Sequence, residues 1–319
     1  MHILIFEVTM QKKIPVADAH CDFLYGMVNR KYDINTLSDR QTIFLPYLAG
    51  GGVALQFFAA WVDTKLRKTY IEQCLDMFDA FYRMIDDNDA VVPMDKDFKP
   101  ESGKIAAVLT VEGGEAINGN LSVLRMFYKL GVRAMSLTWN TVNELASPAV
   151  RRGHKGLTAL GRKVVREMCR LGMAVDVSHL NDAGIDDVLS VASRPVFASH
   201  SNARRICDHP RSLSDRQIKA IAGNNGVMCV NFYHLQLCGR KTATIDDVIR
   251  HIDHFVQTGG IDCVGFGSDF DGMNTYPEGI ENSAAYPDIL NALLKSGYSE
   301  EEVRKIAFDN LYRYIVQFY

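Results

Sequence analysis

Short apolar segments alternate with longer amphipathic segments along almost the whole chain. This alternation predicts strands followed by helices, because buried parallel strands are short and apolar whereas surface helices repeat their apolar positions at helical spacing. Segments with strand character are 14–20, 53–62, 104–111, 132–139, 173–179, 195–200, 226–233 and 263–269. Segments with helical spacing are 66–86, 121–130, 157–172, 182–192, 214–223, 244–259, 287–297 and 299–317. Ser299, followed by Glu302, fits a capping box that opens the last helix.

Strands separated by helices in this way predict an α/β fold, a (β/α)₈ barrel of the TIM type. No linker rich in Pro, Gly or Ser divides the sequence, so residues 1–319 are expected to form one domain. Extra elements are expected in the long connection 21–52 and in the C-terminal helices. The alternative is a doubly wound open sheet, which normally carries a glycine-rich phosphate loop after its first strand. This chain has AHCDFLYG at that point.

The composition narrows the classes of function. The 319 residues include 35 Lys and Arg against 38 Asp and Glu, a net charge of −3, without the basic excess of a nucleic-acid-binding protein. No apolar run approaches the ~18 residues that span a bilayer, and neither end of the sequence carries a targeting or anchoring pattern. The seven cysteines include no CxxC pair and predict reduced thiols. We therefore expect a cytoplasmic protein with neither a nucleic-acid nor a membrane partner.

Residues able to do chemistry recur where the predicted strands end. In a barrel these carboxyl ends meet at one face, so their side chains are expected to gather there. A lone histidine is more often a packed or solvated side chain, but several hard-to-bury groups on one rim favour a metal site, because buried charges need pairing or a metal. The residues at these ends are His20, Asp22, Glu112, Trp139, His179, His200, Tyr233 and Asp269.

The spacing of these residues suggests how metals could be held. His20 and Asp22 follow a strand two residues apart and are expected on the same side, with Cys21 on the other. Glu112 follows a very apolar strand and precedes two glycines that permit close backbone approach. A carboxylate so placed can bridge two cations about 3.5–4 Å apart. A surface salt bridge is the alternative for Glu112. His179 and His200 would each supply an imidazole to a second metal.

Asp269 closes the last predicted strand in the segment GFGSDFDG. A carboxylate there can take a proton from a water molecule and return it to a leaving amine. Asp271 has the same chemistry but lies further into the loop, where a side chain is held less rigidly. Asp269 is therefore the favoured acid/base residue.

Collinear motifs connect the chain to a known family. They are DAHCD, TVEGGEAI, LGVRAMSLTWN, VDVSHL, FASHSNARRICDHPRSLSD, VNFY and VGFGSDFDG, in this order. From about residue 16 to 315 the chain resembles the renal, or membrane, dipeptidases of peptidase family M19, in the amidohydrolase superfamily. The resemblance implies a (β/α)₈ barrel with two zinc ions that hydrolyses dipeptides and tolerates a D-residue at the C-terminal position.

The resemblance also implies roles for individual residues. His20 and Asp22 would bind one zinc ion, His179 and His200 the other, and Glu112 would bridge the two and so take part in catalysis. Asp269 matches the acid/base aspartate of the family. Arg211 matches an arginine that binds the substrate's terminal carboxylate, a role that suits the guanidinium fork, with Arg204 and Arg205 as nearby alternatives. Tyr233 aligns with a pocket tyrosine.

One departure from the family pattern lies directly after Leu137 and Thr138. Well-known members have a histidine there, able to polarise the scissile carbonyl, whereas this chain has Trp139 followed by Asn140. Both residues offer uncharged donors, and Asn140 is a candidate substrate-binding residue. Loss of charge at such a position could reduce the rate by around 10²–10³. His154, in the RRGHKG loop, is a candidate replacement.

The function expected from the sequence is a zinc-dependent dipeptidase that acts on small dipeptides. One alternative is a metal-dependent hydrolase of another small amide, ester or lactone at the same site. A second alternative is a metal-binding protein that has lost turnover, because Trp139 replaces the histidine. A homodimer is compatible with the sequence.

Overall fold

The computed structural model describes residues 14–153 and 155–319 of the chain. Within them, parallel strands close into a ring in the order β1-β2-β4-β5-β6-β7-β8-β9, because β2 pairs with β4 and β9 pairs with β1. The strands of the ring are β1 (Val16–Asp18), β2 (Val53–Trp61), β4 (Ile105–Glu112), β5 (Ala134–Ser136), β6 (Ala174–Asp176), β7 (Phe197–Ala198), β8 (Val227–Val230) and β9 (Val264–Phe266). Every predicted strand is confirmed, and so is the (β/α)₈ barrel, which excludes the open sheet.

One further strand was not predicted. β3 (Val91–Pro93) pairs with the first residues of β4 and lies outside the ring. Three residues are too short a run to produce a recognisable alternation in the sequence.

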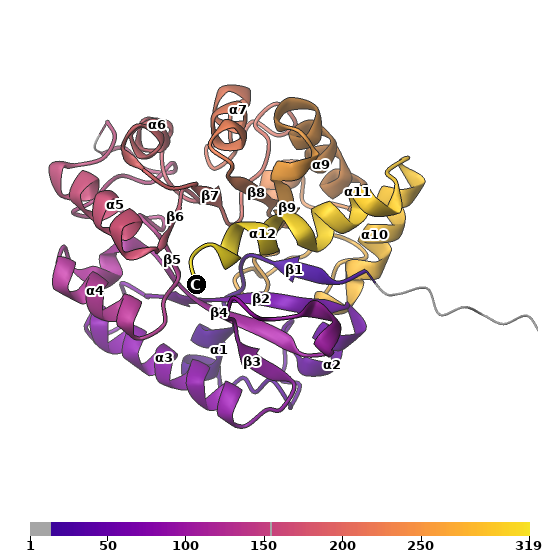
Figure 1. Ribbon diagram of the computed structural model, residues 1–319, viewed down its shortest axis with the longest axis horizontal. Helices are drawn as coiled ribbons and strands as arrows, with labels where there is room; N and C mark the ends of the chain where they lie inside the picture. Colours follow the sequence, from indigo (N-terminus) through magenta and orange to yellow (C-terminus); the bar gives the residue numbers. More distant parts are fainter. Residues whose placement is uncertain (1–13, 154) are drawn as a thin grey trace, which may run out of the picture.

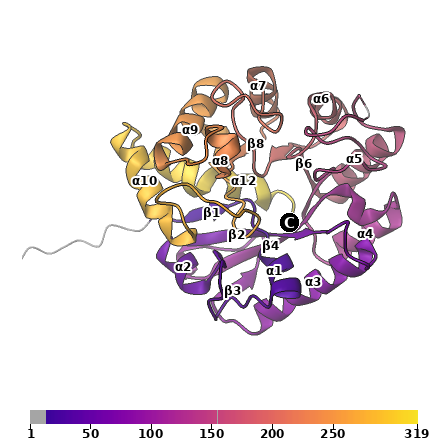
Figure 2. The same ribbon diagram turned by 180° about the vertical axis from the view of Figure 1, so that it is seen from behind.

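Helices surround the strands as an outer layer (Figures 1 and 2). The predicted ones are confirmed as α3 (Tyr70–Asp86), α4 (Leu121–Lys129), α5 (Ala159–Leu171), α6 (Asp182–Val191), α7 (Asp215–Gly223), α9 (Ile245–Gly259) and α10 (Tyr286–Lys295). The segment 299–317 is helical throughout, as α11 (Glu300–Arg304), a π-helical turn (Lys305–Asp309) and α12 (Asn310–Val316). Ser299 and Glu302 form the predicted capping box at its start.

Shorter elements fill the connections. The long connection 21–52 contains α1 (Phe23–Arg30) and α2 (Leu45–Gly50), as expected, and α8 (His234–Leu237) follows β8. Single 3₁₀ turns occupy Pro100–Ser102, Gly114–Ile117, Ile261–Cys263 and Ser283–Ala285.

The barrel interior is filled by small residues and a few rings, among them Ala17, Ala134, Ala174, Phe57 and Phe197, and it is continuous with the C-terminal helix. In Figure 1, α12 lies across the ring of strands. The hydroxyl of Tyr314 on α12 donates to the carbonyl of Pro195, just before β7 begins. The C-terminal helix therefore closes the end of the barrel where strands start. The opposite end, where strands finish, remains available for a site.

All seven cysteines are free thiols, as expected, and Cys207 and Cys238 alone among them are partly exposed. Among the described residues, no helix combines the length and the apolar character that crossing a bilayer requires. The N-terminal apolar stretch and His154 lie outside the described residues.

Candidate metal centre and active site

A cavity of about 490 Å³ lies at the carboxyl ends of the strands. It is lined by most of the residues predicted for the site: Asp22, Glu112, Trp139, Asn140, His179, Arg211, Tyr233 and Asp269. His20 and His200 are buried, only 3% and 0% exposed, and their imidazoles face the carboxylate of Glu112. The predicted site residues are therefore gathered in one place.

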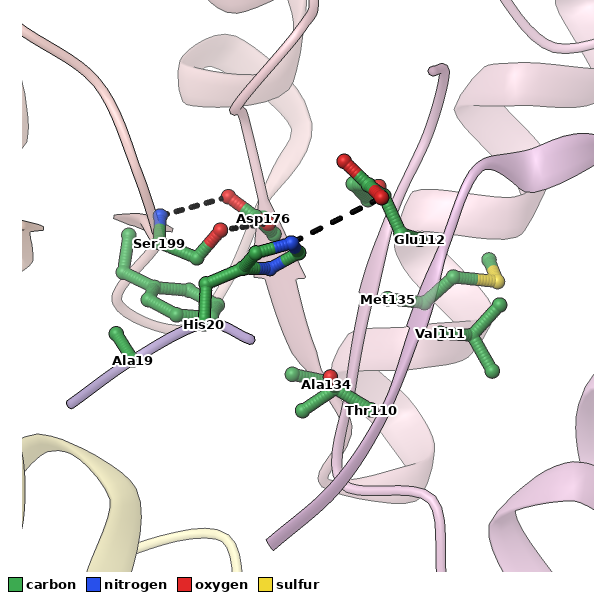
Figure 3. A pocket seen from close by; sticks show the side chains of 11 residues that line it. Ala19, His20, Thr110, Val111, Glu112, Ala134, Met135, Asp176 and Ser199 are labelled. Carbon is green, nitrogen blue, oxygen red and sulfur yellow. Dashed lines mark hydrogen bonds and ion pairs between the residues drawn. The ribbon is translucent and has the colours of Figure 1, made fainter. Parts of the chain in front are cut away.

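Glu112 lies at the centre of this group. Its Oε1 atom is 2.9 Å from His179 Nε2 and 3.5 Å from His200 Nε2. Its Oε2 atom faces His20 Nε2 at 3.8 Å, the ion pair drawn in Figure 3. Thus the two carboxylate oxygens face two different sets of imidazoles, as a bridging carboxylate requires.

The glycines after Glu112 permit the close approach expected from the sequence. Gly113 has φ +101°, and a Cβ atom on Gly114 would lie 2.5 Å from the carbonyl oxygen of Leu137. Both positions are therefore restricted to glycine.

His179 and His200 point the same ring nitrogen at each other. Their Nε2 atoms are 2.9 Å apart. The other nitrogen of His179, Nδ1, is 2.9 Å from Asn140 Oδ1, an atom that only accepts hydrogen bonds. Nδ1 of His179 therefore carries the proton, and Nε2 presents a lone pair towards His200 and Glu112. His179 adopts φ +69°, an uncommon conformation that functional sites often contain.

His20 belongs to a second group of ligand atoms. Its Nε2 atom lies 3.6 Å from Asp22 Oδ2 and 3.8 Å from Asp269 Oδ1. Within the described chain, His20 Nε2 and Asp22 Oδ1 are buried and have no hydrogen-bond partner. His20 and Asp22 thus face the same side, as predicted, whereas Cys21 donates its thiol to the carbonyl of Phe57.

Burial and charge act strongly on these groups. Burial raises the pKa of Glu112 well above its ordinary value and lowers the pKa of His179 and His200 well below theirs. Burial also works to lower the pKa of His20, but the carboxylates of Glu112, Asp22 and Asp269 together raise it to about 10. Burying several carboxylates together is unfavourable unless positive charge compensates them, so the cluster favours a bound cation.

These donors fit metal ions. The imidazoles of His20 and His200 and the carboxylates of Glu112, Asp22 and Asp269 form two groups whose ligand atoms converge, His20–Glu112–His200 and His20–Asp22–Asp269. A buried imidazole nitrogen of His20 and a buried carboxylate oxygen of Asp22 that lack hydrogen-bond partners in the described part of the chain, within a donor set of imidazole and carboxylate, match zinc-type ligation. His20 and Asp22 could hold one ion, His179 and His200 another, with Glu112 between them.

Asp269 and Asp271 have different surroundings. Asp269 faces His20 and accepts a hydrogen bond from Asn231 Nδ2 at 3.0 Å, and burial raises the pKa of its carboxyl to about 6. The Asp271 carboxylate instead accepts hydrogen bonds from the Thr42 amide and hydroxyl and from the Ile43 amide. The geometry therefore favours Asp269 as the acid/base residue.

The three candidate arginines also differ. Arg211 is 5% exposed and lines the cavity, and its two terminal nitrogens have no hydrogen-bond partner among the residues that the structure describes. Arg204 forms a bidentate ion pair with Asp182, and Arg205 is exposed. Arg211 is the one placed to receive a carboxylate.

The remaining predicted residues lie on the cavity wall. Asn140 contacts His179, so its first role is to position that ring, and its role in substrate binding stays a prediction. Trp139 stacks edge-on against Trp61 with ring centroids 4.9 Å apart, and Trp61 packs in the same way against Tyr25. Tyr233 lines the cavity.

Two residues of the site were missed in the sequence. Trp61 ends β2, and Asn231 directly follows β8, where it donates to Asp269. Both follow the same strand-end rule that identified the other residues, so extending that rule to every strand end would have found them.

Comparison with known proteins identifies the family of the chain. A family model described as membrane dipeptidase (peptidase family M19) matches residues 6–318. The chain belongs to this family. Human Dipeptidase 3 is 32% identical over 318 residues, which cover 95% of this chain, and the chain spans 65% of the length of that relative.

Two solved structures of similar proteins cover nearly the whole chain. The dipeptidase AC, a metallopeptidase of family M19, is 31% identical with a TM-score of 0.89, over 96% of this chain and 99% of its own. A metallopeptidase from Rhodobacter sphaeroides, bound to a phosphinate mimic of the dipeptide L-Ala-D-Ala, is 28% identical with a TM-score of 0.88, over 97% of this chain and 100% of its own.

Proposed function

We propose that this protein is a zinc-dependent dipeptidase that binds two zinc ions. The observation that carries the proposal is the position of Arg211 in the same cavity as the imidazole–carboxylate cluster, with terminal guanidinium nitrogens that are buried and have no hydrogen-bond partner in the described part of the chain. A dipeptide has its terminal carboxylate one residue beyond the scissile bond. A buried arginine near the cluster suits such a substrate.

Asp269 and Arg211 have different roles in the proposed hydrolysis. Zinc, when bound, supplies Lewis-acid polarisation of a carbonyl and activation of water at neutral pH. Asp269, held by Asn231, takes a proton from water and delivers it to the leaving amino group. Arg211 binds the carboxylate and so orients the scissile bond. Tolerance of a D-residue is part of the proposal and is supported by the L-Ala-D-Ala mimic bound to the Rhodobacter sphaeroides protein.

A second candidate is a metal-binding protein without turnover. It is favoured by Trp139, whose indole packs on Trp61 and has its ring centroid 6.4 Å from that of His179, where a charged group would help the reaction. A hydrolase of other small amides, esters or lactones would not need Arg211.

The test is hydrolysis of alanine-containing L,L and L,D dipeptides by the purified, zinc-supplemented protein, alongside tripeptides, dipeptide amides and a lactone. We expect cleavage of free dipeptides and much weaker cleavage of the others. Two bound zinc ions without turnover of any compound would support the second candidate. Preference for the lactone or the amides would contradict the dipeptidase.

A further inference from the structure

Two aspartate–serine pairs with the same hydrogen-bond pattern hold the rim of the barrel. Asp18 at the end of β1 accepts from Ser268, backbone amide to Oδ1 at 2.9 Å and hydroxyl to Oδ2 at 2.6 Å. Asp176 at the end of β6 accepts from Ser199 in the same way, at 3.0 Å and 2.6 Å. In both pairs the serine lies two residues after a phenylalanine that is in register with the aspartate.

The sequence around each serine repeats as well. Phe266-Gly-Ser268 is followed by Asp269, and Phe197-Ala-Ser199 is followed by His200. Each pair therefore comes directly before one residue of the proposed site. The repeat is short and its copies are far apart in the chain, so it does not stand out as an internal repeat.

The two pairs face opposite sides of the barrel wall. Asp18 also accepts a hydrogen bond from the hydroxyl of Tyr286, which belongs to the outer core between strands and helices. Asp176 and Ser199 instead line a cavity of about 10 Å³ inside the barrel, together with His20 and Glu112 (Figure 3). Of the two pairs, the inner one thus contacts the imidazole of a proposed ligand histidine, whereas the outer one contacts only the backbone of His20, whose amide donates to Asp18 and whose carbonyl accepts from Ser268.

Ser199 contacts that histidine directly. Its hydroxyl oxygen is 2.7 Å from His200 Nδ1 and 2.6 Å from Asp176 Oδ2. Asp176 Oδ1 accepts the backbone amides of Ser178 and Ser199, and its Oδ2 is the acceptor that faces the Ser199 hydroxyl. The single hydroxyl proton of Ser199 is therefore donated to Asp176, and the serine oxygen accepts from His200 Nδ1–H. The Ser178 hydroxyl, at 3.3 Å and uncharged, competes weakly.

We propose that Asp176 and Ser199 are positioning residues that act through His200. They hold its imidazole with the proton on Nδ1 and the Nε2 lone pair directed at Glu112, the form that a metal ligand requires. Asn140 serves His179 in the same way. The outer pair, Asp18 and Ser268, links the ends of β1 and β9 and does not determine which ring nitrogen of a histidine carries the proton. This inference rests on the metal site of the proposed function.

The first test reads the proton directly. In the full-length protein labelled with ¹⁵N-histidine, as purified and again after chelation, we expect His200 to show a hydrogen-bonded Nδ1–H in both states. In Ser199→Ala the Nδ1–H resonance of His200 should move upfield and the proton should exchange faster with water. In the matched variant Ser268→Ala both the chemical shift and the exchange rate of this proton should stay as in the wild type. A proton on Nε2 of His200 in the chelated wild type would overturn the proposal, and this outcome needs no mutant to fold.

The second test is zinc affinity, measured by competition with a chromophoric chelator. Loss of an outer partner of a ligand histidine typically weakens metal binding 10–100-fold. We expect a loss of about that size in Ser199→Ala, and recovery of most of it in Ser199→Thr, which restores a hydroxyl. Unchanged affinity in Ser199→Ala would overturn the proposal. Neither measurement depends on hydrolysis, so failure of the dipeptidase assay would leave this inference intact, and failure here would leave the dipeptidase standing.

Discussion

The Nε2 atoms of His179 and His200 lie 2.9 Å apart, and both are within 3.5 Å of Glu112 Oε1. Three such atoms repel one another unless a proton or a cation lies among them. The fold holds them together from separate strands: Glu112 is the last residue of β4, and His179 and His200 follow β6 and β7. This arrangement suits a cation bound among the three side chains.

Removal of metal should destabilise the protein as well as inactivate it. A ligand that binds only the folded state at 100 times its Kd stabilises by about 2.7 kcal/mol. We expect chelation to lower Tm by several degrees, measured by calorimetry, and zinc to restore it. Glu112→Gln is the control, because it weakens both proposed sites. An equal drop in Tm on chelation in this variant would show that the metal acts elsewhere.

Asp269→Asn should separate catalysis from metal binding. The amide keeps the shape of the side chain but cannot accept the proton, and general acid–base groups contribute about 10²–10⁴ in rate. We expect kcat to fall at least ~100-fold, while metal analysis by mass spectrometry finds most of the zinc retained. Asp271→Asn is the comparison, because its carboxylate serves Thr42 and Ile43, and it should lower Tm rather than kcat. Wild-type activity in Asp269→Asn would exclude its catalytic role.

Gly272 leaves room for the two carboxylates of the site. A Cβ atom on Gly272 would lie 2.0 Å from Asp22 Oδ2 and 2.7 Å from Asp269 Oδ1. Gly272→Ala must therefore displace these groups, and a displacement near 1 Å can lower rates about 10²-fold. We expect reduced zinc content and activity in a folded protein. Gly223→Ala is the matched control, because nothing lies within 4 Å of its added Cβ. Full zinc content in Gly272→Ala would contradict the arrangement at Asp22.

The sequence was sufficient to predict the barrel and the gathering of the candidate ligand residues at one end of it, because both depend on local pattern; that these residues bind metal stays a prediction. Glu112 ends an apolar strand and His179 lies shortly after another, and barrel topology brings all strand ends to one face. Apart from 104–111, the predicted strands are longer than the observed ones, since strand-like composition continues into the loops at both ends. β3 has too few residues to show any alternation.

Contacts between distant segments could not be predicted. Choosing among Arg204, Arg205 and Arg211 required the path of the loop, which is set by pairing of Ala203 with Leu213 and by the ion pair of Arg204 with Asp182. The hydrogen bond between Asn231 and Asp269 likewise depends on β8 and β9 lying side by side. The pattern of apolar and polar residues within one segment does not indicate how close its side chains lie to those of a distant segment.

Arg211→Ala should change substrate preference rather than abolish chemistry. A charge-assisted hydrogen bond is worth about 1.5–3 kcal/mol, or roughly tenfold to a hundredfold in affinity. We expect KM for free dipeptides to rise by that factor, with little change for dipeptide amides, in steady-state assays. Arg204→Ala, which removes the pair with Asp182 and a hydrogen bond to the Ser212 carbonyl but no group that lines the cavity, should leave KM close to wild type. An equal loss on both substrates would show that Arg211 is structural.

His251 should make stability depend on pH, away from the metal site. Its ring is fully buried, with Nδ1 accepting from the Ala203 amide and Nε2 donating to the carbonyl of Leu237, which suits only the neutral form. Burial lowers the pKa of this imidazole to about 4, against an ordinary value near 6.5. The unfolded chain therefore takes up the proton first as pH falls. Stability present at pH 7 is lost progressively between pH of about 6.5 and 4, by about 2 kcal/mol at pH 5.

The measurement is urea unfolding at pH 7 and pH 5 for the wild type and His251→Gln, both in the same excess of chelator so that metal release does not contribute. Gln cannot titrate, and its amide offers one acceptor and one donor to replace those of the ring. We expect the drop in free energy of unfolding between pH 7 and 5 to be smaller in the variant by about 2 kcal/mol, because its unfolded state gains no proton at position 251. Equal drops in the two proteins would mean that His251 is protonated in the folded state, and the hydrogen bond from the Ala203 amide would then have to be reassigned.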